Sequence, residues 1–223
     1  MTEHELALRT DLIAACRSLN ALGINRGTSG NISLRCGDRM LISPSATPYD
    51  ALEPEMIAAM PFDGSSGHWE GPLKPSTEWR FHFDILKRRP EMNAVVHAHP
   101  TYCTTLAIAR RSIPACHYMI AAFGGPTVRC ADYATFGTRE LSANIIMAMH
   151  ERSACLLANH GMIACGKDLD KAMWSAVELE TLSRQYYHSL QLGEPFILDD
   201  AEMERVAEKF KSYGPRKADG TQH

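Results

Sequence analysis

Two histidines, His97 and His99, flank Ala98 directly after the apolar run 94–96. Residues i and i+2 of a β-strand point to the same face, so the two imidazoles are expected to lie side by side. Two neighbouring imidazoles are a natural pair of ligands for a zinc ion. The alternative that the motif alone leaves open is a pair of histidines at the surface or in a hydrogen-bonded contact.

Two further residues could complete a metal site. His160 closes a second apolar run, and Gly161 after it permits a sharp turn. Glu78 stands at the start of a predicted helix, where the helix N-terminus favours a carboxylate. Glu178 and Glu180 are other possible ligands, but they lie in the middle of a predicted helix and are interpreted as its solvated face. The residue types favour three histidines and one carboxylate, although spacing along the chain cannot show that they converge.

Three polar turns have the composition of a phosphate-binding site. The segment 27–31 reads Gly-Thr-Ser-Gly-Asn, and Ser45-Ala46 and Ser76-Thr77 lie in two more turns. Glycines expose backbone N–H groups, and hydroxyl groups add further donors. The first turn lacks the spacing of a nucleotide P-loop, and each turn alone is also typical of an ordinary turn or helix cap. Together with a candidate metal site, they favour a small phosphorylated substrate over a protein or nucleic-acid partner.

The composition is that of a globular protein. The chain has 223 residues, of which 45% are hydrophobic and 22% charged, and its formal net charge is −3. This charge gives no general attraction to nucleic acid. No segment resembles a signal peptide, and no apolar run approaches the roughly 20 residues of a membrane span. The seven cysteines are odd in number and form no C-x-x-C pair, which favours reduced thiols in the cytoplasm.

The hydrophobic patterning predicts alternating helices and strands that must position these residues. Tight strand pairs with helices between them favour an α/β fold, a three-layer α/β/α sandwich with a mixed, mostly antiparallel sheet. The expected helices span 3–22, 77–89, 101–110, a segment beginning at Thr138, a long segment from Asp168 to Gly193, and 199–212. The expected strands span 32–35, 40–42, 94–99, 127–130, 154–158 and 162–165, with a hairpin or loop over 60–75.

Several motifs occur in the order found in one known family. The segments 27–31, 74–80, 97–100 and 159–161 resemble the motifs of the class II aldolase/adducin family. The segments 113–122, 133–141 and 208–214 extend the likeness over nearly the whole chain. The resemblance implies a single class II aldolase domain over 1–223. It also implies a class II, metal-dependent aldehyde-lyase that cleaves a ketose 1-phosphate reversibly to dihydroxyacetone phosphate and an aldehyde.

The resemblance also assigns roles to individual residues. It implies one zinc ion per subunit and a homotetramer with active sites between subunits, where Tyr118 reaches the site of an adjacent subunit. Glu78 is implied as the acid/base at carbon, with Tyr118 and Tyr213 serving the aldehyde end of a phosphorylated sugar substrate. The implied metal ligands are Glu78, His97, His99 and His160, and the implied phosphate-binding residues are Gly30, Asn31, Ser45, Ala46, Ser76 and Thr77.

The resemblance leaves some points open. Ala46 stands where the family commonly has glycine, and an alanine would be strained there if the turn needs a positive φ. Phe123 is expected to help shape the aldehyde pocket because it is near Tyr118 in sequence. L-fuculose 1-phosphate is the leading substrate, with 5-deoxyribulose 1-phosphate and 5-methylthioribulose 1-phosphate as alternatives within the family. The alternative of another class is a non-catalytic scaffold of the adducin type.

Overall fold

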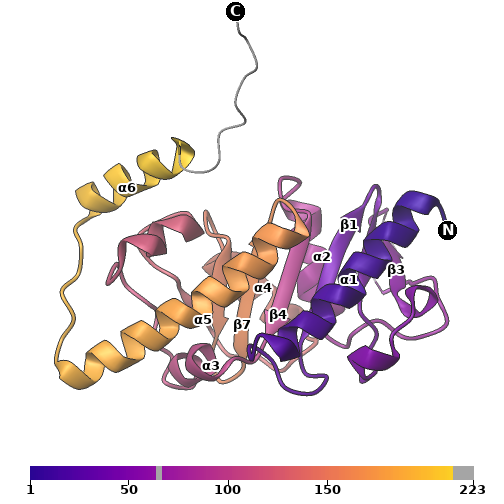
Figure 1. Cartoon of the computed structure of the whole chain (residues 1–223), viewed down its shortest axis with the longest axis horizontal. Coiled ribbons are helices and arrows are strands. Elements are labelled where there is room, and N and C mark those ends of the chain that lie inside the picture. Colours follow the sequence, from indigo (N-terminus) through magenta and orange to yellow (C-terminus); the bar gives the residue numbers. More distant parts are fainter. Residues whose placement is uncertain (64–66, 213–223) are drawn as a thin grey trace, which may run out of the picture.

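The computed structural model describes residues 1–63 and 67–212, and a seven-stranded sheet forms its centre (Figure 1). The order of strands across the sheet is β3-β2-β1-β4-β7-β6-β5. Neighbouring strands run antiparallel except β5 and β6, which are parallel. The predicted mixed, mostly antiparallel sheet is therefore confirmed. The strands are β1 Asn31–Cys36, β2 Arg39–Ile42, β3 Ala58–Pro61, β4 Ala94–Ala98, β5 Cys130–Ala131, β6 Ala154–Leu157 and β7 Gly161–Gly166.

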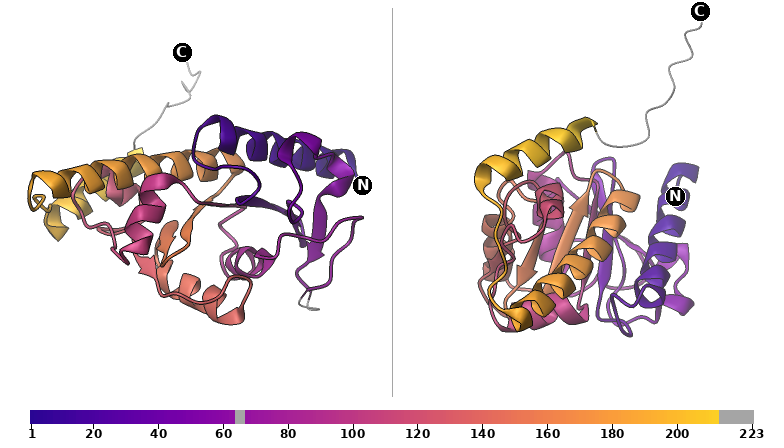
Figure 2. Two further views of the ribbon diagram at one scale, coloured as in Figure 1. Left: turned by 90° about the horizontal axis from the view of Figure 1, so that it is seen from below. Right: turned by 60° about the vertical axis from the view of Figure 1, so that its left-hand side comes forward.

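Helices cover both faces of the sheet, and Figure 2 (left) shows the resulting layers edge-on. One face packs against α1 and α5 with α3 beside them, and the other packs against α2 and α4. The last helix, α6, lies over the segment Tyr118–Phe123 (Figure 1). The α-helices are α1 Glu3–Ala21, α2 Trp79–Arg88, α3 Thr101–Ile108, α4 Arg139–Ala148, α5 Leu169–Leu192 and α6 Asp200–Ser212, and the 3-10 helices are η1 Tyr49–Ala51, η2 Pro54–Met56 and η3 Tyr118–Phe123.

The central strand β4 is buried along its whole length because helices cover both faces of the sheet. Val96 belongs to the core under α1 and α5, whereas Val95 belongs to the core under α2 and α4. The side chain of His97 follows the alternation and contacts Phe81 of α2, with ring centroids 5.4 Å apart. A strand that is buried on both faces is typically a continuous apolar run, and here the run places an imidazole in the core.

The predicted ends of two helices are confirmed by their capping contacts. The Thr138 hydroxyl accepts a hydrogen bond from the backbone N–H of Leu141 at 3.2 Å, at the start of α4. The Asp168 carboxylate accepts one from the N–H of Lys171 at 2.8 Å, at the start of α5. Such caps satisfy backbone donors that the first turn of a helix leaves unpaired.

The structure differs from the sequence expectations in three details. The strand expected at 127–130 is only β5, because Val128 forms an isolated bridge with Ile113 instead of joining the sheet. The sequence does not predict strand β3, which pairs with β2 and extends the sheet; the hairpin or loop expected over 60–75 starts at the last two residues of this strand. Glu180 does not belong to a solvated face, because its carboxylate accepts hydrogen bonds from the backbone N–H groups of Tyr102 and Cys103.

All seven cysteines are free thiols, and four of them are buried in the core. Burial raises the pKa of Cys16 and of Cys165 to about 12, so both remain uncharged at neutral pH. They therefore behave as small apolar side chains. Among the described residues, no helix combines the length and the apolar character that a membrane crossing requires.

Candidate active site

Three imidazoles meet at one edge of the sheet. His97 lies in β4, His99 follows that strand, and His160 lies in the turn between β6 and β7. Because β4 and β7 are antiparallel neighbours, the end of β4 lies beside the start of β7, where Ala98 pairs with Met162. The possible ligand nitrogens of the three histidines lie within 4.8 Å of one another. The structure thus brings together residues that are far apart in sequence.

Gly161, which follows His160, has a different role from the expected one of permitting a sharp turn. The left-handed residue is Asn159, with φ of 55°, and asparagine tolerates this conformation better than most residues. A Cβ atom on Gly161 would lie 2.6 Å from the Ala98 carbonyl oxygen and 2.6 Å from the ring of His99. Gly161 is therefore required because β4 and the His99 ring approach the backbone closely, and not because it permits the turn.

Glu78 lies within contact of two of these histidines. Its Oε2 is 3.1 Å from His97 Nε2, and its Oε1 is 3.2 Å from His160 Nε2. Glu78 precedes α2, but its side chain makes no capping hydrogen bond to that helix. Burial alone would raise the pKa of Glu78, yet His97 and His160 lower it well below its usual range. The neighbouring histidines, rather than the expected helix N-terminus, therefore favour the carboxylate.

The donor set fits a metal cation. His97 Nδ1 lies 2.9 Å from the backbone carbonyl of Met162, which can only accept, so Nδ1 donates and Nε2 is the nitrogen that faces the cluster. Burial and the neighbouring His97 and His160 lower the pKa of His99 to about 4, which keeps that ring neutral. Among the described residues, buried Glu78 Oε1 has no hydrogen-bond partner. Imidazole nitrogens beside a carboxylate oxygen without a hydrogen-bond partner are ligand types that a metal cation such as zinc prefers.

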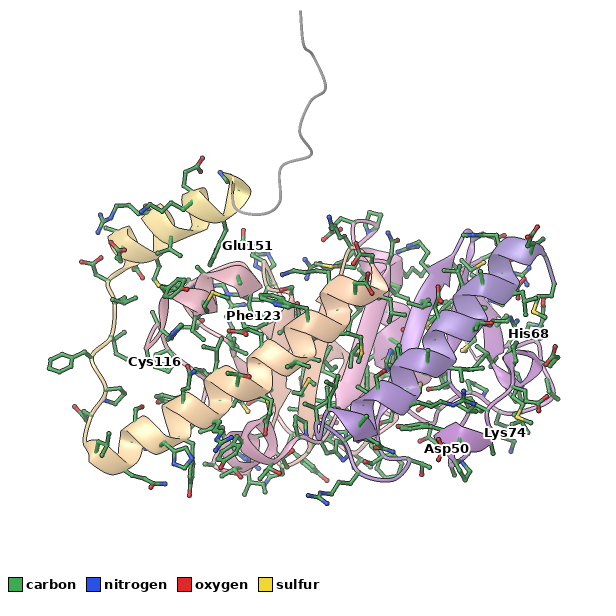
Figure 3. All side chains as sticks on the ribbon, viewed as in Figure 1. Asp50, His68, Lys74, Cys116, Phe123 and Glu151 are labelled. Atoms are coloured by element: carbon green, nitrogen blue, oxygen red, sulfur yellow. The ribbon has the colours of Figure 1, made fainter. Side chains whose placement is uncertain are left out.

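A cavity of about 450 Å³ opens beside this cluster. Of the four candidate metal ligands, Glu78, His99 and His160 line it, whereas His97 is fully buried. None of its described lining residues is a lysine, so the side chains that face it offer no amine for a Schiff base, and Lys74 lies in an exposed loop (Figure 3). The candidate phosphate residues all line this cavity: Gly30, Asn31, Ser45, Ala46, Ser76 and Thr77.

Backbone hydrogen bonds hold two of the polar turns together. The N–H of Ser45 donates to the Lys74 carbonyl at 3.1 Å, and the N–H of Ser76 donates to the Ser43 carbonyl at 3.0 Å. These two amides are therefore occupied, so Ser45 and Ser76 can offer a phosphate their hydroxyl groups rather than their N–H groups. The third turn approaches closely because Gly30 has no side chain: a Cβ there would lie 2.9 Å from the His97 carbonyl oxygen.

Ala46 has a left-handed backbone, with φ of 53°. The strain expected from alanine at this turn is therefore present. We expect Ala46→Gly to stabilise the protein by about 1 kcal/mol, because glycine avoids the Cβ clash of this region. This corresponds to an increase in Tm of roughly 2–4 °C for a domain of this size.

The matched control is Ala14→Gly, at an exposed position inside α1. Glycine should lower stability there by about 1 kcal/mol, because it adds freedom to the unfolded chain without relieving strain. Thermal unfolding of both variants checks the prediction. A decrease in Tm for Ala46→Gly similar to that of the control would contradict it.

The predicted catalytic Tyr118 does not line this cavity within one chain. Tyr118 is half exposed in η3, where its ring stacks on His117 with a centroid separation of 4.8 Å. It lines a different cavity together with Trp174 of α5 and Phe210 of α6. Tyr213 lies outside the described residues. The roles assigned to both tyrosines remain predictions.

The expectation that Phe123 shapes a pocket is wrong. Its side chain is fully buried in the core under α5 (Figure 3), and it lines neither of the two cavities described above. Closeness to Tyr118 in sequence was its only basis. Tyr118 and Phe123 lie at opposite ends of the helix η3, and their side chains differ in exposure: Tyr118 is half exposed, whereas Phe123 is buried.

Sequence reasoning missed two groups of residues. Exposed Tyr133 and Phe136 also line the cavity, and no spacing rule singled them out. Buried Ser33 and His82 form a hydrogen-bonded chain to Asn31. The spacing in the sequence could have indicated these hydrogen-bonded residues. Ser33 lies two residues after Asn31, on the same strand face, and His82 lies four residues after Glu78, on the same helix face.

The fold and the site together define a class of protein. An α/β/α sandwich holds a buried carboxylate beside three histidines, next to a cavity edged by serine and threonine turns. This is the arrangement of a metal-dependent enzyme for a small anionic substrate. The family model described as Class II Aldolase and Adducin N-terminal domain matches residues 10–187. The chain belongs to the class II aldolase and adducin family.

Individual relatives are similar over nearly their whole length. A 5-methylthioribulose-1-phosphate/5-deoxyribulose-1-phosphate aldolase of Rhodospirillum rubrum is 53% identical, over 96% of this chain and 96% of that protein. An L-fuculose phosphate aldolase of Escherichia coli K12 is 49% identical, over 94% and 96%. A solved structure of an L-fuculose 1-phosphate aldolase has a TM-score of 0.88 at 38% identity, over 95% and 98%. The chain is thus an enzyme of the class II aldehyde-lyase type.

Proposed function

We propose that this protein is a zinc-dependent aldolase, one catalytic domain over 1–223, which cleaves a ketose 1-phosphate reversibly to dihydroxyacetone phosphate and an aldehyde. The observation that carries the proposal is the contact of Glu78 with His97 and His160, beside a cavity edged by the three polar turns. An intact set of ligands argues against a non-catalytic scaffold, since a scaffold does not need them.

The proposed metal ligands are Glu78, His97, His99 and His160. The chemistry that a bound zinc ion supplies is Lewis-acid stabilisation of the negative charge that develops as the C3–C4 bond breaks. Zinc is supported by the residue types, since three histidines and one carboxylate are typical ligands of this cation.

The polar turns are proposed to hold the phosphate group. The Ser76 hydroxyl oxygen accepts a hydrogen bond from the Glu78 N–H at 3.2 Å, which leaves its O–H to donate. Because backbone hydrogen bonds fix both turns, the Ser45 and Ser76 hydroxyl groups can donate to a phosphate with little loss of conformational freedom. Glu78 is proposed as the acid/base: it gives a proton to the carbon that becomes the hydroxymethyl group of dihydroxyacetone phosphate and removes that proton in condensation. Glu78 lines the cavity and contacts His97 and His160, which supports a place beside this carbon.

The aldehyde end is proposed to involve a second subunit. Tyr118 would remove the C4 hydroxyl proton in cleavage from the site of a neighbouring copy in a homotetramer, and Tyr213 would serve the same end. Exposed apolar side chains support contact between copies on this face: Phe196 is 99% exposed, Leu192 94%, and Tyr118 50%. Soluble proteins rarely leave such a group uncovered.

The aldehyde is proposed to carry a small apolar end. Tyr133, Ala134 and Phe136 add aromatic and apolar side chains to the lining of the cavity. L-Fuculose 1-phosphate would release lactaldehyde, whereas 5-deoxyribulose 1-phosphate and 5-methylthioribulose 1-phosphate would release acetaldehyde and methylthioacetaldehyde. All three products end in a methyl or methylthio group. The printed names of the relatives include both substrate classes. The seven free thiols support a place in the cytoplasm.

A panel of the three ketose 1-phosphates tests the proposal. Protein loaded with zinc is mixed with each compound, and dihydroxyacetone phosphate is measured with a coupled dehydrogenase. We expect release from at least one compound and the highest kcat/KM for the natural substrate class. If none is cleaved while metal analysis shows about one zinc per chain, the aldolase proposal is wrong.

A further inference from the structure

A chain of four buried polar side chains leads from the core of the sheet to Glu78. The Ser33 hydroxyl lies 2.8 Å from His82 Nδ1, and His82 Nε2 lies 2.5 Å from Asn31 Oδ1. Asn31 Nδ2 then lies 3.1 Å from Glu78 Oε2. Ser33 and His82 are fully buried, and Asn31 and Glu78 are almost so. Neither Ser33 nor His82 reaches the cavity.

The direction of this chain follows from its last member. Asn31 Nδ2 donates to Glu78 Oε2, because a carboxylate oxygen that faces an amide accepts from its NH₂ group. Asn31 must therefore turn its NH₂ group to Glu78 and its carbonyl oxygen to His82. That oxygen also only accepts, so the proton of the neutral His82 ring must be on Nε2. His82 Nδ1 is then an acceptor for the Ser33 hydroxyl.

The packing fixes each link of the chain. Asn31 and Ser33 lie in β1 and point to the same face of the sheet as His97, with Asn31 directly opposite His97 in the β1–β4 ladder. The ring of His82 stacks on Phe81, with centroids 4.8 Å apart. Burial lowers the pKa of His82 to about 3, so the ring stays neutral at the pH of the cell. An Asn31 side chain without this donor could rotate and present its oxygen to the Glu78 carboxylate, which would repel it.

We infer that His82 is a positioning residue: its Nε2–H group fixes the Asn31 amide, and Asn31 in turn holds one oxygen of Glu78 in place. This inference rests on the proposed role of Glu78 as metal ligand and acid/base. Loss of a hydrogen-bond partner of a metal ligand, as Asn31 is of Glu78, typically costs 10–100-fold in metal affinity or activity, and His82→Phe is expected to cause this loss by releasing Asn31. The loss should follow the donor at the Nε2 position rather than the volume of the side chain.

Three variants separate the donor from the packing. His82→Phe keeps a ring but removes the donor, whereas His82→Gln restores an N–H near the Nε2 position. Ile85→Val lies one turn further along α2, is fully buried, and serves as the packing control. We expect His82→Phe to bind zinc 10–100-fold more weakly and to lower kcat more than it changes KM. His82→Gln should recover most of both losses, and Ile85→Val should change neither.

The tautomer of His82 gives a readout that needs neither metal nor activity. Nitrogen-15 NMR of the metal-free wild-type protein should show a protonated Nε2 and a bare Nδ1 for this ring. A ring protonated on Nδ1, or a His82→Phe variant that matches Ile85→Val in zinc affinity and kcat, would overturn the inference. A wild-type protein that cleaves no ketose phosphate would instead refute the proposed function, while the tautomer and the zinc affinities would still decide the role of His82.

Discussion

Replacement of His99 by alanine should weaken zinc binding about a hundredfold and abolish cleavage at limiting zinc. Zinc bound by four protein ligands is worth roughly 10–16 kcal/mol, so each ligand contributes about 3 kcal/mol, which corresponds to a factor of about 10². The half-buried His99 is a better choice than His97, because His97 is fully buried and its loss would leave a hole in the core. Competition with a chelator of known affinity measures the change.

The matched control for this variant is His150→Asn. Its side chain is 76% exposed, at the end of α4. This control should bind zinc and cleave substrate as the wild-type protein does. If His99→Ala retained wild-type zinc affinity while its thermal unfolding remained normal, the three histidines would not form the metal site.

The second large effect is expected for Glu78→Gln. The glutamine has nearly the same shape but cannot accept a proton, so kcat for cleavage should fall by about 10³-fold, within the range of general acid–base catalysis. Zinc content must be measured in the same samples, because Glu78 is also a proposed ligand. Glu194→Gln, at an exposed position after α5, is the control and should be fully active. Unchanged turnover of Glu78→Gln with zinc retained would remove Glu78 as the acid/base.

Much of this fold could be predicted from local patterns. The helix α5 is an example, since the capping Asp168 and the terminal Gly193 bound a clear apolar face. The short strand β5 could not be predicted in the same way. Val128 and Cys130 have similar apolar character, and only the contact of Ile113 with Val128 decides which residue joins the sheet. A pairing between distant segments leaves no periodic signal in either of them.

In the candidate site too, local spacing identifies some residues, whereas contacts between distant segments could not be predicted. His97 and His99 could be identified from their spacing, because a strand places alternate residues on one face. The convergence of His160 and Glu78 with them could not, because it depends on β4 and β7 being neighbours. The cause of the lowered Glu78 pKa also could not be predicted from the sequence. The sequence attributed the charge of Glu78 to a helix N-terminus, whereas the structure shows that two imidazoles lower its pKa.

The exchange of hydrogen between dihydroxyacetone phosphate and heavy water tests the central proposal most directly. This partial reaction needs the phosphate turns, the metal ligands and Glu78, but it needs no aldehyde, so it does not depend on which sugar is the substrate. Protein loaded with zinc should introduce deuterium at the hydroxymethyl carbon, as measured by proton NMR, and Glu78→Gln should not. Absence of exchange in zinc-loaded wild-type protein, or exchange by Glu78→Gln at the wild-type rate, would contradict the proposed site.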